Sequence, residues 1–192
     1  MIIHLNGWPG AGKKTIGQIL AVKLNACFIH NHMLHGVAIM CAGVDSPDRW
    51  PLYETVRAAA YAALAKRPAA QAFVMTNALC KNAPRERDAW QHVVNLAINR
   101  QVPLVPVILQ LSPEENYRRV QSADRVGKKM TSAEELKGYF KVDAIQEPDV
   151  PETFAVDVTD LSADQAAEQI FSHISTISST LRPATNQHLQ LR

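Results

Sequence analysis

A glycine-rich segment near the start of the chain constrains the fold more than any other feature of the sequence. This segment, residues 7–15, follows an apolar run at residues 2–6. It leads into residues 13–24, where apolar side chains recur at helical spacing. Between a strand and a helix, glycines let backbone N–H groups turn inward around phosphate oxygens, and Lys13 reaches the terminal phosphates. The segment therefore predicts a loop that binds a nucleotide triphosphate. Its predicted binding residues are Gly7, Pro9, Gly10, Ala11, Gly12, Lys13, Lys14 and Thr15.

The residue after the motif lysine bears on metal binding. It is Lys14, where many phosphate loops place a Ser or Thr that ligates Mg²⁺. Thr15 carries the nearest hydroxyl and is the candidate metal ligand, directly or through a water. The GxPGxGKxT spacing is similar to the loop of adenylate kinases, in which that position also lacks a hydroxyl. Phosphate binding is therefore a firmer prediction than metal ligation.

The rest of the chain alternates predicted strands and helices, which indicates an α/β fold with a parallel sheet covered on both faces. We expect strands at residues 2–6, 26–29, 72–78, 104–111 and 153–158, and helices at residues 13–24, 50–66, 85–100, 132–140, 162–175 and from residue 113. Residues 30–48 are expected to be a mixed segment that ends in a turn. Pro106 removes a backbone donor, so its strand should start late or be locally irregular. Ligands of such folds bind at the carboxyl ends of the strands.

Composition bounds the size and the class of the protein. With 192 residues, 47% of them hydrophobic, the chain is expected to form one domain at residues 1–178, followed by a flexible tail at residues 179–192. A net charge of +2 does not favour a general role in nucleic-acid or membrane binding. Three cysteines without CxxC spacing, and the absence of a signal or spanning segment, favour free thiols and the cytoplasm.

The phosphate loop, the order of elements and residues 114–129 together resemble the P-loop small-molecule kinases typified by shikimate kinase, and especially a bacterial group described as kinase-like or ATP-binding. The resemblance spans residues 2–174. It implies a P-loop NTPase fold with strand order 2-3-1-4-5, ATP and Mg²⁺ as cofactors, and a small-molecule acceptor. It also implies a lid at about residues 118–131 and an acceptor-binding region at about residues 30–68.

The lid and the end of the last strand supply further candidates on the nucleotide side. Arginines and lysines gather between residues 118 and 129, and Arg125 is the candidate that stabilises charge during phosphoryl transfer. By resemblance, Arg119 stacks on adenine, and Asp157 and Thr159 lie in the loop that binds the base. A solvated helix face would also explain the arginines, and a cap of the last helix would also explain Thr159.

The acceptor side is predicted from the ends of the second and third strands. Where shikimate kinases place acidic residues, this chain has His30, Asn31 and His32, so the acceptor is expected to differ from shikimate. Neutral His32 can accept a hydroxyl proton and is the candidate base, with His30 and Asn31 positioning the acceptor. Histidines at the surface or packed in the fold are the alternative. Thr76 and Asn77, at the end of the third strand, are candidates for binding the acceptor or a metal-bound water, with a strand-end cap as the alternative for Asn77.

One helical arginine is a candidate anchor for a charged acceptor. Tyr53, Arg57 and Tyr61 share a helix face. By resemblance, Arg57 matches the arginine that binds an anionic acceptor in the shikimate kinase family, and a guanidinium suits a carboxylate or phosphate. A plain surface arginine is the alternative.

Three functions are compatible with these residues. The leading hypothesis is an ATP-dependent phosphotransferase acting on a small hydroxylated metabolite, with Lys13, Arg125 and His32 as the catalytic residues. A second is a kinase of nucleotides or nucleic-acid ends. A third is a non-catalytic, ATP-binding regulatory protein, which Lys14 and the missing carboxylates motivate. No specific protein partner and no membrane association are inferred.

Overall fold

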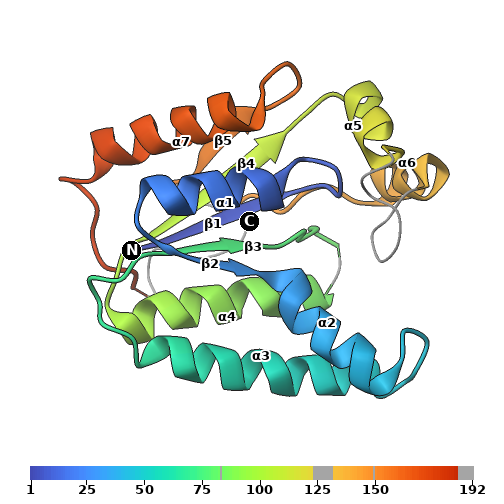
Figure 1. Cartoon of the computed structure of the whole chain (residues 1–192), viewed down its shortest axis with the longest axis horizontal. Helices are drawn as coiled ribbons and strands as arrows, with labels where there is room; N and C mark the ends of the chain where they lie inside the picture. The colour runs from blue at the N-terminus through green and yellow to red at the C-terminus, as the bar shows by residue number, and fades with distance from the viewer. Residues whose placement is uncertain (83, 123–131, 149, 186–192) are drawn as a thin grey trace.

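The computed structural model describes residues 1–82, 84–122, 132–148 and 150–185, and its centre is a five-stranded parallel sheet. The strands are β1 (Ile2–Gly7), β2 (Cys27–His30), β3 (Phe73–Thr76), β4 (Leu104–Gln110) and β5 (Phe154–Asp157). They lie in the order β2-β3-β1-β4-β5, with every neighbouring pair parallel. The predicted fold class and strand order are therefore confirmed (Figure 1).

Helices cover both faces of the sheet (Figure 1). They are α1 (Lys13–Lys23), α2 (Asn31–Ala42), α3 (Arg49–Ala65), α4 (Pro84–Arg100), α5 (Pro113–Val120), α6 (Ala133–Val142) and α7 (Ala163–Ile177). One core joins α1 and α7 to the sheet, through buried residues such as Leu20 and Ile170. The opposite core joins α4 to the other face through Trp90 and Phe73, with the end of α3 beside it. Each large apolar side chain buried in this way contributes about 1.5–3 kcal/mol.

The main departure from expectation is α2, because residues 31–42 form a helix where we expected a mixed segment. Only Ala38 of this helix is buried, whereas Met33 and Met40 are largely exposed. Helices were predicted from apolar residues that recur every three to four positions. A helix that buries so little surface lacks this pattern, so the sequence did not indicate it. Gly43, with a φ of 94°, ends the helix.

Of the two alternatives expected for Pro106, a late start of β4 is wrong, because the strand runs from Leu104 through the proline. Pro106 pairs with His4 of β1, while pairing with β5 begins only at Val107. On one side, therefore, β4 has no strand neighbour at the proline, and the missing N–H costs no ladder hydrogen bond there.

The described part of the expected tail, residues 179–185, contacts the domain. The backbone N–H of Ala184 donates to the carbonyl of Val102 at 3.1 Å, just after α4. Leu181 and Ala184 pack against the two cores. Residues 186–192 lie outside the described part of the chain. Across the described ranges, no helix is both long and apolar enough to cross a lipid bilayer.

Candidate functional site

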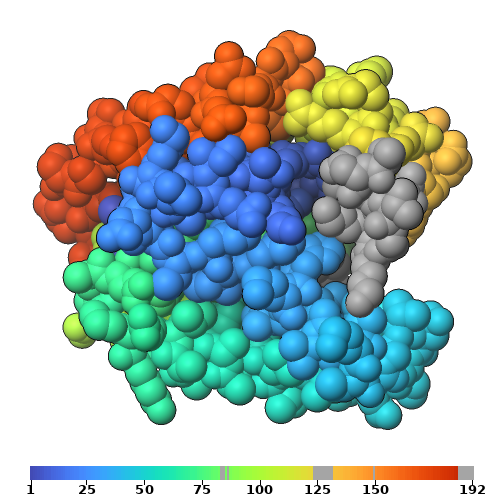
Figure 2. All heavy atoms as spheres, in the orientation of Figure 1, coloured from blue at the N-terminus to red at the C-terminus, as the bar shows by residue number. Residues whose placement is uncertain are grey.

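The candidate site lies at the carboxyl edge of the sheet, where β1 passes through the phosphate loop into α1. Two groups of helices flank this edge in the space-filling view: α5 and α6 on one side, and α2 with the start of α3 on the other (Figure 2). This is the edge at which parallel α/β folds bind their ligands. Arg119 lies on α5, and the acceptor candidates Asn31, His32 and Arg57 lie on α2 and α3.

The phosphate loop has the backbone conformation that its glycines permit. Gly10 and Gly12 have φ values of 97° and 83°, a region that side chains rarely adopt. A Cβ atom on Gly10 would lie 2.4 Å from the Nδ2 atom of Asn116, so the loop also needs glycine for space. Gly12 begins α1 without a side-chain cap, which leaves the first N–H groups of the helix for an anion.

Lys13 reaches back across the loop. Its ammonium group donates to the carbonyl oxygens of Gly7 at 2.5 Å and of Trp8 at 2.8 Å. The charge therefore lies inside the ring of backbone groups, where it can contact the oxygens of a bound phosphate. Lys14 and Thr15 follow in the first turn of α1 and are exposed.

Two buried asparagines that sequence reasoning missed hold the phosphate loop in place. Asn6 accepts from the N–H groups of Gly7 and Leu79, at 2.9 and 2.7 Å, and donates to the carbonyls of Leu79 and Gln146. Asn116 of α5 donates to the carbonyl of Pro9 at 2.7 Å. One signal was available for Asn6, since it is a polar residue at the carboxyl end of an apolar strand. Nothing in the sequence connects Asn116 with a loop 107 residues away.

Two histidines lie against the end of β3. The Nε2 atom of His4 donates to the Oδ1 atom of Asn77 at 3.0 Å, and Nδ1 of His30 hydrogen-bonds the hydroxyl of Thr76 at 2.7 Å. Burial lowers the pKa of His4 to about 4, with a further contribution from the charge of Lys13. His4 is therefore neutral near pH 7, and the Asn77 side chain bonds this histidine.

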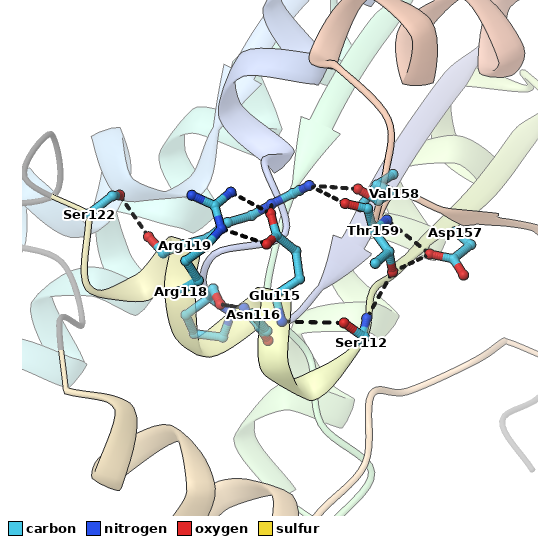
Figure 3. Close-up of polar contacts among 10 residues, drawn as sticks. Ser112, Glu115, Asn116, Arg118, Arg119, Ser122, Asp157, Val158 and Thr159 are labelled. Carbon is cyan, nitrogen blue, oxygen red and sulfur yellow. Dashed lines mark hydrogen bonds and ion pairs between the residues drawn. The ribbon is translucent and has the colours of Figure 1, made fainter.

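On the nucleotide side, Arg119 is fixed by hydrogen bonds to Glu115 and to the loop after β5 (Figure 3). Its guanidinium donates to Glu115 at 2.6 Å and to the carbonyls of Val158 and Thr159 at 2.7 and 2.9 Å. Hydrogen bonds from Arg118 and Arg119 hold the pKa of Glu115 at about 2, well below its usual range. A guanidinium held by its edges in this way presents a flat face to a nucleotide base.

The same loop brings Asp157 and Thr159 together (Figure 3). The Thr159 hydroxyl donates to the Asp157 carboxylate at 2.6 Å and accepts from the N–H of Ser112 at 2.9 Å. The hydrogen bond from Thr159 lowers the pKa of Asp157. Ser162, with Gln165, caps α7, so the alternative in which Thr159 caps that helix is excluded.

On the acceptor side, Tyr53 joins α3 to the start of α2. Its hydroxyl donates to the Oδ1 atom of Asn31 at 2.8 Å, and the guanidinium of Arg57 lies over its ring at 5.3 Å. Arg57 is only 3% exposed and pairs with Glu54, so it is not a surface arginine. His32 is exposed, with its ring 5.0 Å from that of His30.

The structure therefore collects the predicted residues into three groups. Lys13 lies in the phosphate loop, Arg119 joins Asp157 and Thr159, and the acceptor candidates lie at the ends of β2 and β3 and on α3. Arg125, the candidate for stabilising the transition state, lies outside the described residues, as does most of the expected lid.

The described side chains offer little to a magnesium ion. Within the described ranges, no group of three or more His, Cys, Asp or Glu side chains is arranged to hold a metal. Kinases commonly hold Mg²⁺ through substrate phosphates and water, with few protein ligands. The hydroxyl of Thr15, one residue past the usual ligand position, fits that limited role.

The sequence profile of the AAA domain family matches residues 3–139 of this chain. A search of curated proteins finds no match. The fold is similar to that of a provisionally assigned kinase from Chloroflexus aurantiacus, with a TM-score of 0.65 and 19% identity over 91% of this chain and 96% of the other.

Two further solved structures share the fold. A gluconokinase from Sinorhizobium meliloti has a TM-score of 0.61 and 23% identity over 93% of each chain. A shikimate kinase from Acinetobacter baumannii, in complex with shikimate, has a TM-score of 0.55 and 16% identity over 91% of this chain and 93% of the other. The resemblance to P-loop kinases of the shikimate kinase group is therefore confirmed at the level of the fold.

Proposed function

Because this chain belongs to the AAA domain family, we propose that it is a phosphotransferase that binds ATP and transfers the γ-phosphate to a small hydroxylated metabolite. The observation that carries the proposal is the phosphate loop, in which Lys13 lies across a ring of backbone groups at the start of α1. Folds shared with a gluconokinase and a shikimate kinase support a small acceptor over a nucleic-acid end.

The nucleotide is held by the first group of residues. The loop from Gly7 to Gly12 and the first turn of α1, including Lys14 and Thr15, surround the β- and γ-phosphates, and Lys13 exchanges a carbonyl partner for a phosphate oxygen. Arg119 stacks on the base beside Thr159. Mg²⁺, held by the phosphates and by Thr15 or its water, would neutralise part of their charge.

The acceptor is held by the second group. His30, Asn31, Arg57, Thr76 and Asn77 orient the metabolite, and exposed His32 takes the proton of the attacking hydroxyl. Arg125 is the predicted cation that closes on the transferred group. The protein forms no covalent intermediate in this scheme. It accelerates phosphoryl transfer by positioning the two substrates and by stabilising the negative charge of the transferred group.

The proposal is tested first by nucleotide binding. Thermal unfolding is measured with ATP, ADP and GTP, each with and without Mg²⁺, for the wild type, Lys13→Ala and the control Lys23→Ala at the far end of α1. A ligand at about 100 times its Kd adds about 2.7 kcal/mol of stability. We expect an ATP shift that Mg²⁺ increases, that Lys13→Ala abolishes and that Lys23→Ala largely keeps. The absence of any nucleotide shift in the wild type would refute the proposal.

Turnover is tested second, by ADP release with a panel of sugars, sugar acids, polyols and nucleosides. We expect one acceptor class to raise ADP release, and His32→Ala to remove that increase without removing ATP binding.

One observation favours a second function, that of a regulatory ATP-binding protein. The residues at the ends of β2 and β3 include no carboxylate, since they are His30, Asn31, Thr76 and Asn77. Tight ATP binding without turnover of any acceptor would support that function instead.

A further inference from the structure

A cluster of arginine and aromatic side chains lies beside the proposed acceptor region. The guanidinium carbons of Arg49 and Arg85 lie 4.6 and 3.9 Å from the ring centre of Trp50. The ring of His35 lies 4.8 Å from that of Trp50 and 4.7 Å from that of Tyr53. The cluster thus joins α2 to the first turns of α3 and α4, three elements that are separate in the sequence.

Two positive charges of this cluster have no ion-pair partner in the part of the chain that the structure describes. In the described part of the chain, neither Arg49 nor Arg85 forms an ion pair, and the one carboxylate that pairs with an arginine of this region is Glu54, which pairs with Arg57. Burial, followed by the charges of Arg49 and Arg85, lowers the pKa of His35. The histidine is therefore neutral near pH 7 and adds no positive charge to the cluster.

Arg49 and Arg57 each have a buried donor atom without a partner. Arg49 donates through Nη1 to the carbonyl of Val44 at 2.5 Å, but its Nε is buried and has no hydrogen-bond partner. The Nη1 atom of Arg57, in a residue only 3% exposed, is likewise unsatisfied. An unsatisfied, buried, charged donor is costly, and an anionic ligand would relieve the cost. A guanidinium on an aromatic face keeps its N–H groups in the plane, where they can bind an anion.

The cluster is continuous with the predicted acceptor residues. Tyr53 contacts His35 on one side, and on the other its hydroxyl bonds Asn31 at the carboxyl end of β2. Tyr53 therefore links the arginine cluster to the end of β2.

We propose that Arg49 and Arg85, against Trp50, bind a phosphate group of the acceptor, so that the metabolite phosphorylated by this protein is itself a phosphomonoester with a free hydroxyl. This inference rests on the proposed function and names the acceptor class. Among the described residues, Arg57 pairs with Glu54, whereas Arg49 and Arg85 form no ion pair, so a phosphate group can pair with these two arginines. One guanidinium can donate two parallel N–H hydrogen bonds to two oxygens of a phosphate, so the arginines would also fix the orientation of the phosphate group.

The test uses the indole N–H resonance of Trp50, identified among the three tryptophans by Trp50→Phe. Inorganic phosphate is titrated at constant ionic strength into the wild type, Lys13→Ala, the double variant Arg49→Gln/Arg85→Gln, and the control Arg67→Gln. Arg67 is an exposed arginine just beyond the C-terminal end of α3, and its side chain bonds Gln71. Lys13→Ala separates binding at the arginines from binding at the phosphate loop.

We expect phosphate to move the Trp50 resonance in the wild type, in Lys13→Ala and in Arg67→Gln, with an affinity that falls roughly tenfold or more in the double variant. An unmoved Trp50 resonance, or equal phosphate affinity in the double variant, would mean that the arginines only pack on Trp50 and would overturn the proposal. This titration does not require ATP. Its failure can therefore be distinguished from a failure of the nucleotide-binding test.

A second arm compares acceptors in matched pairs: ribose with ribose 5-phosphate, glycerol with glycerol 3-phosphate, and adenosine with adenosine monophosphate. We expect kcat/KM to be roughly tenfold or more higher for the phosphorylated member of one pair, and that advantage to vanish in the double variant while ATP binding is kept. The pair that responds distinguishes a sugar or polyol phosphate from a nucleotide. Equal use of both members in a pair that is turned over would contradict the proposal.

Discussion

The buried histidine behind the phosphate loop should make the stability of this protein depend on pH. His4 is 1% exposed, and its ring lies 5.3 Å from that of Trp90. Burial, only partly opposed by the hydrogen bond with Asn77, lowers its pKa from 6.5 to about 4. At pH 5 the unfolded chain therefore binds a proton at this residue that the folded chain does not bind.

The size and the sign of the effect follow from the two pKa values. Because the folded pKa is the lower one, the stability contributed by neutral His4 is complete above about pH 6.5 and is lost as the pH falls toward 4. The full difference corresponds to about 3 kcal/mol, at about 1.36 kcal/mol for each pKa unit. Between about pH 7 and pH 4.5, the expected loss is about 2 kcal/mol, a large fraction of the stability of a single domain.

The assay is urea unfolding at several pH values, for the wild type, His4→Gln and the control His173→Gln. Glutamine keeps a side-chain N–H for Asn77 but does not titrate, so His4→Gln should lose about 2 kcal/mol less than the wild type over this pH range. His173 is only partly buried, and burial lowers its pKa as well, so His173→Gln should change the pH dependence in the same direction as His4→Gln but less. Equal losses in the wild type and in His4→Gln would refute the reasoning.

Two further variants, Gly10→Ala with its control Gly36→Ala, and Asn116→Ala, test how the loop is held. Gly10→Ala should lower ATP affinity by roughly tenfold or more, because its left-handed φ and the 2.4 Å approach to Asn116 both oppose a Cβ atom. Gly36→Ala, in an open helical position, should keep ATP affinity and add about 0.5–1 kcal/mol of stability; equal ATP affinities of the two variants by calorimetry would contradict this account. Asn116→Ala removes the donor to Pro9 and should cost about 1–3 kcal/mol in urea unfolding together with some ATP affinity, and an unchanged midpoint would refute the role given to Asn116.

Local features of this fold were predictable because they depend on residues that are neighbours in the chain. The loop after β1 requires glycines at positions set by backbone conformation. Ser112 and Ser132 cap α5 and α6 from the positions directly before these helices, where a serine is a common cap. Strands buried on both faces appear as short apolar runs, and their alternation with helices indicates a parallel sheet.

The candidate site was predictable only in part, since its side chains meet across the sheet edge. The sequence placed the candidates at the ends of β2 and β3, because chain order alone puts them there. It did not predict that His4 would bond Asn77, or that the end of β3 would be occupied by two histidines.

The sequence by itself determined the phosphate loop, the fold class and the strand order that the resemblance implied. The tertiary structure alone decided the burial of Arg57, the hold of Asn116 on the loop and the meeting of Arg49 with Arg85 on Trp50. These contacts join elements that are far apart in the chain, so no local sequence pattern predicts them. They arise because helices packed around one sheet edge bring distant side chains within a few ångströms of each other.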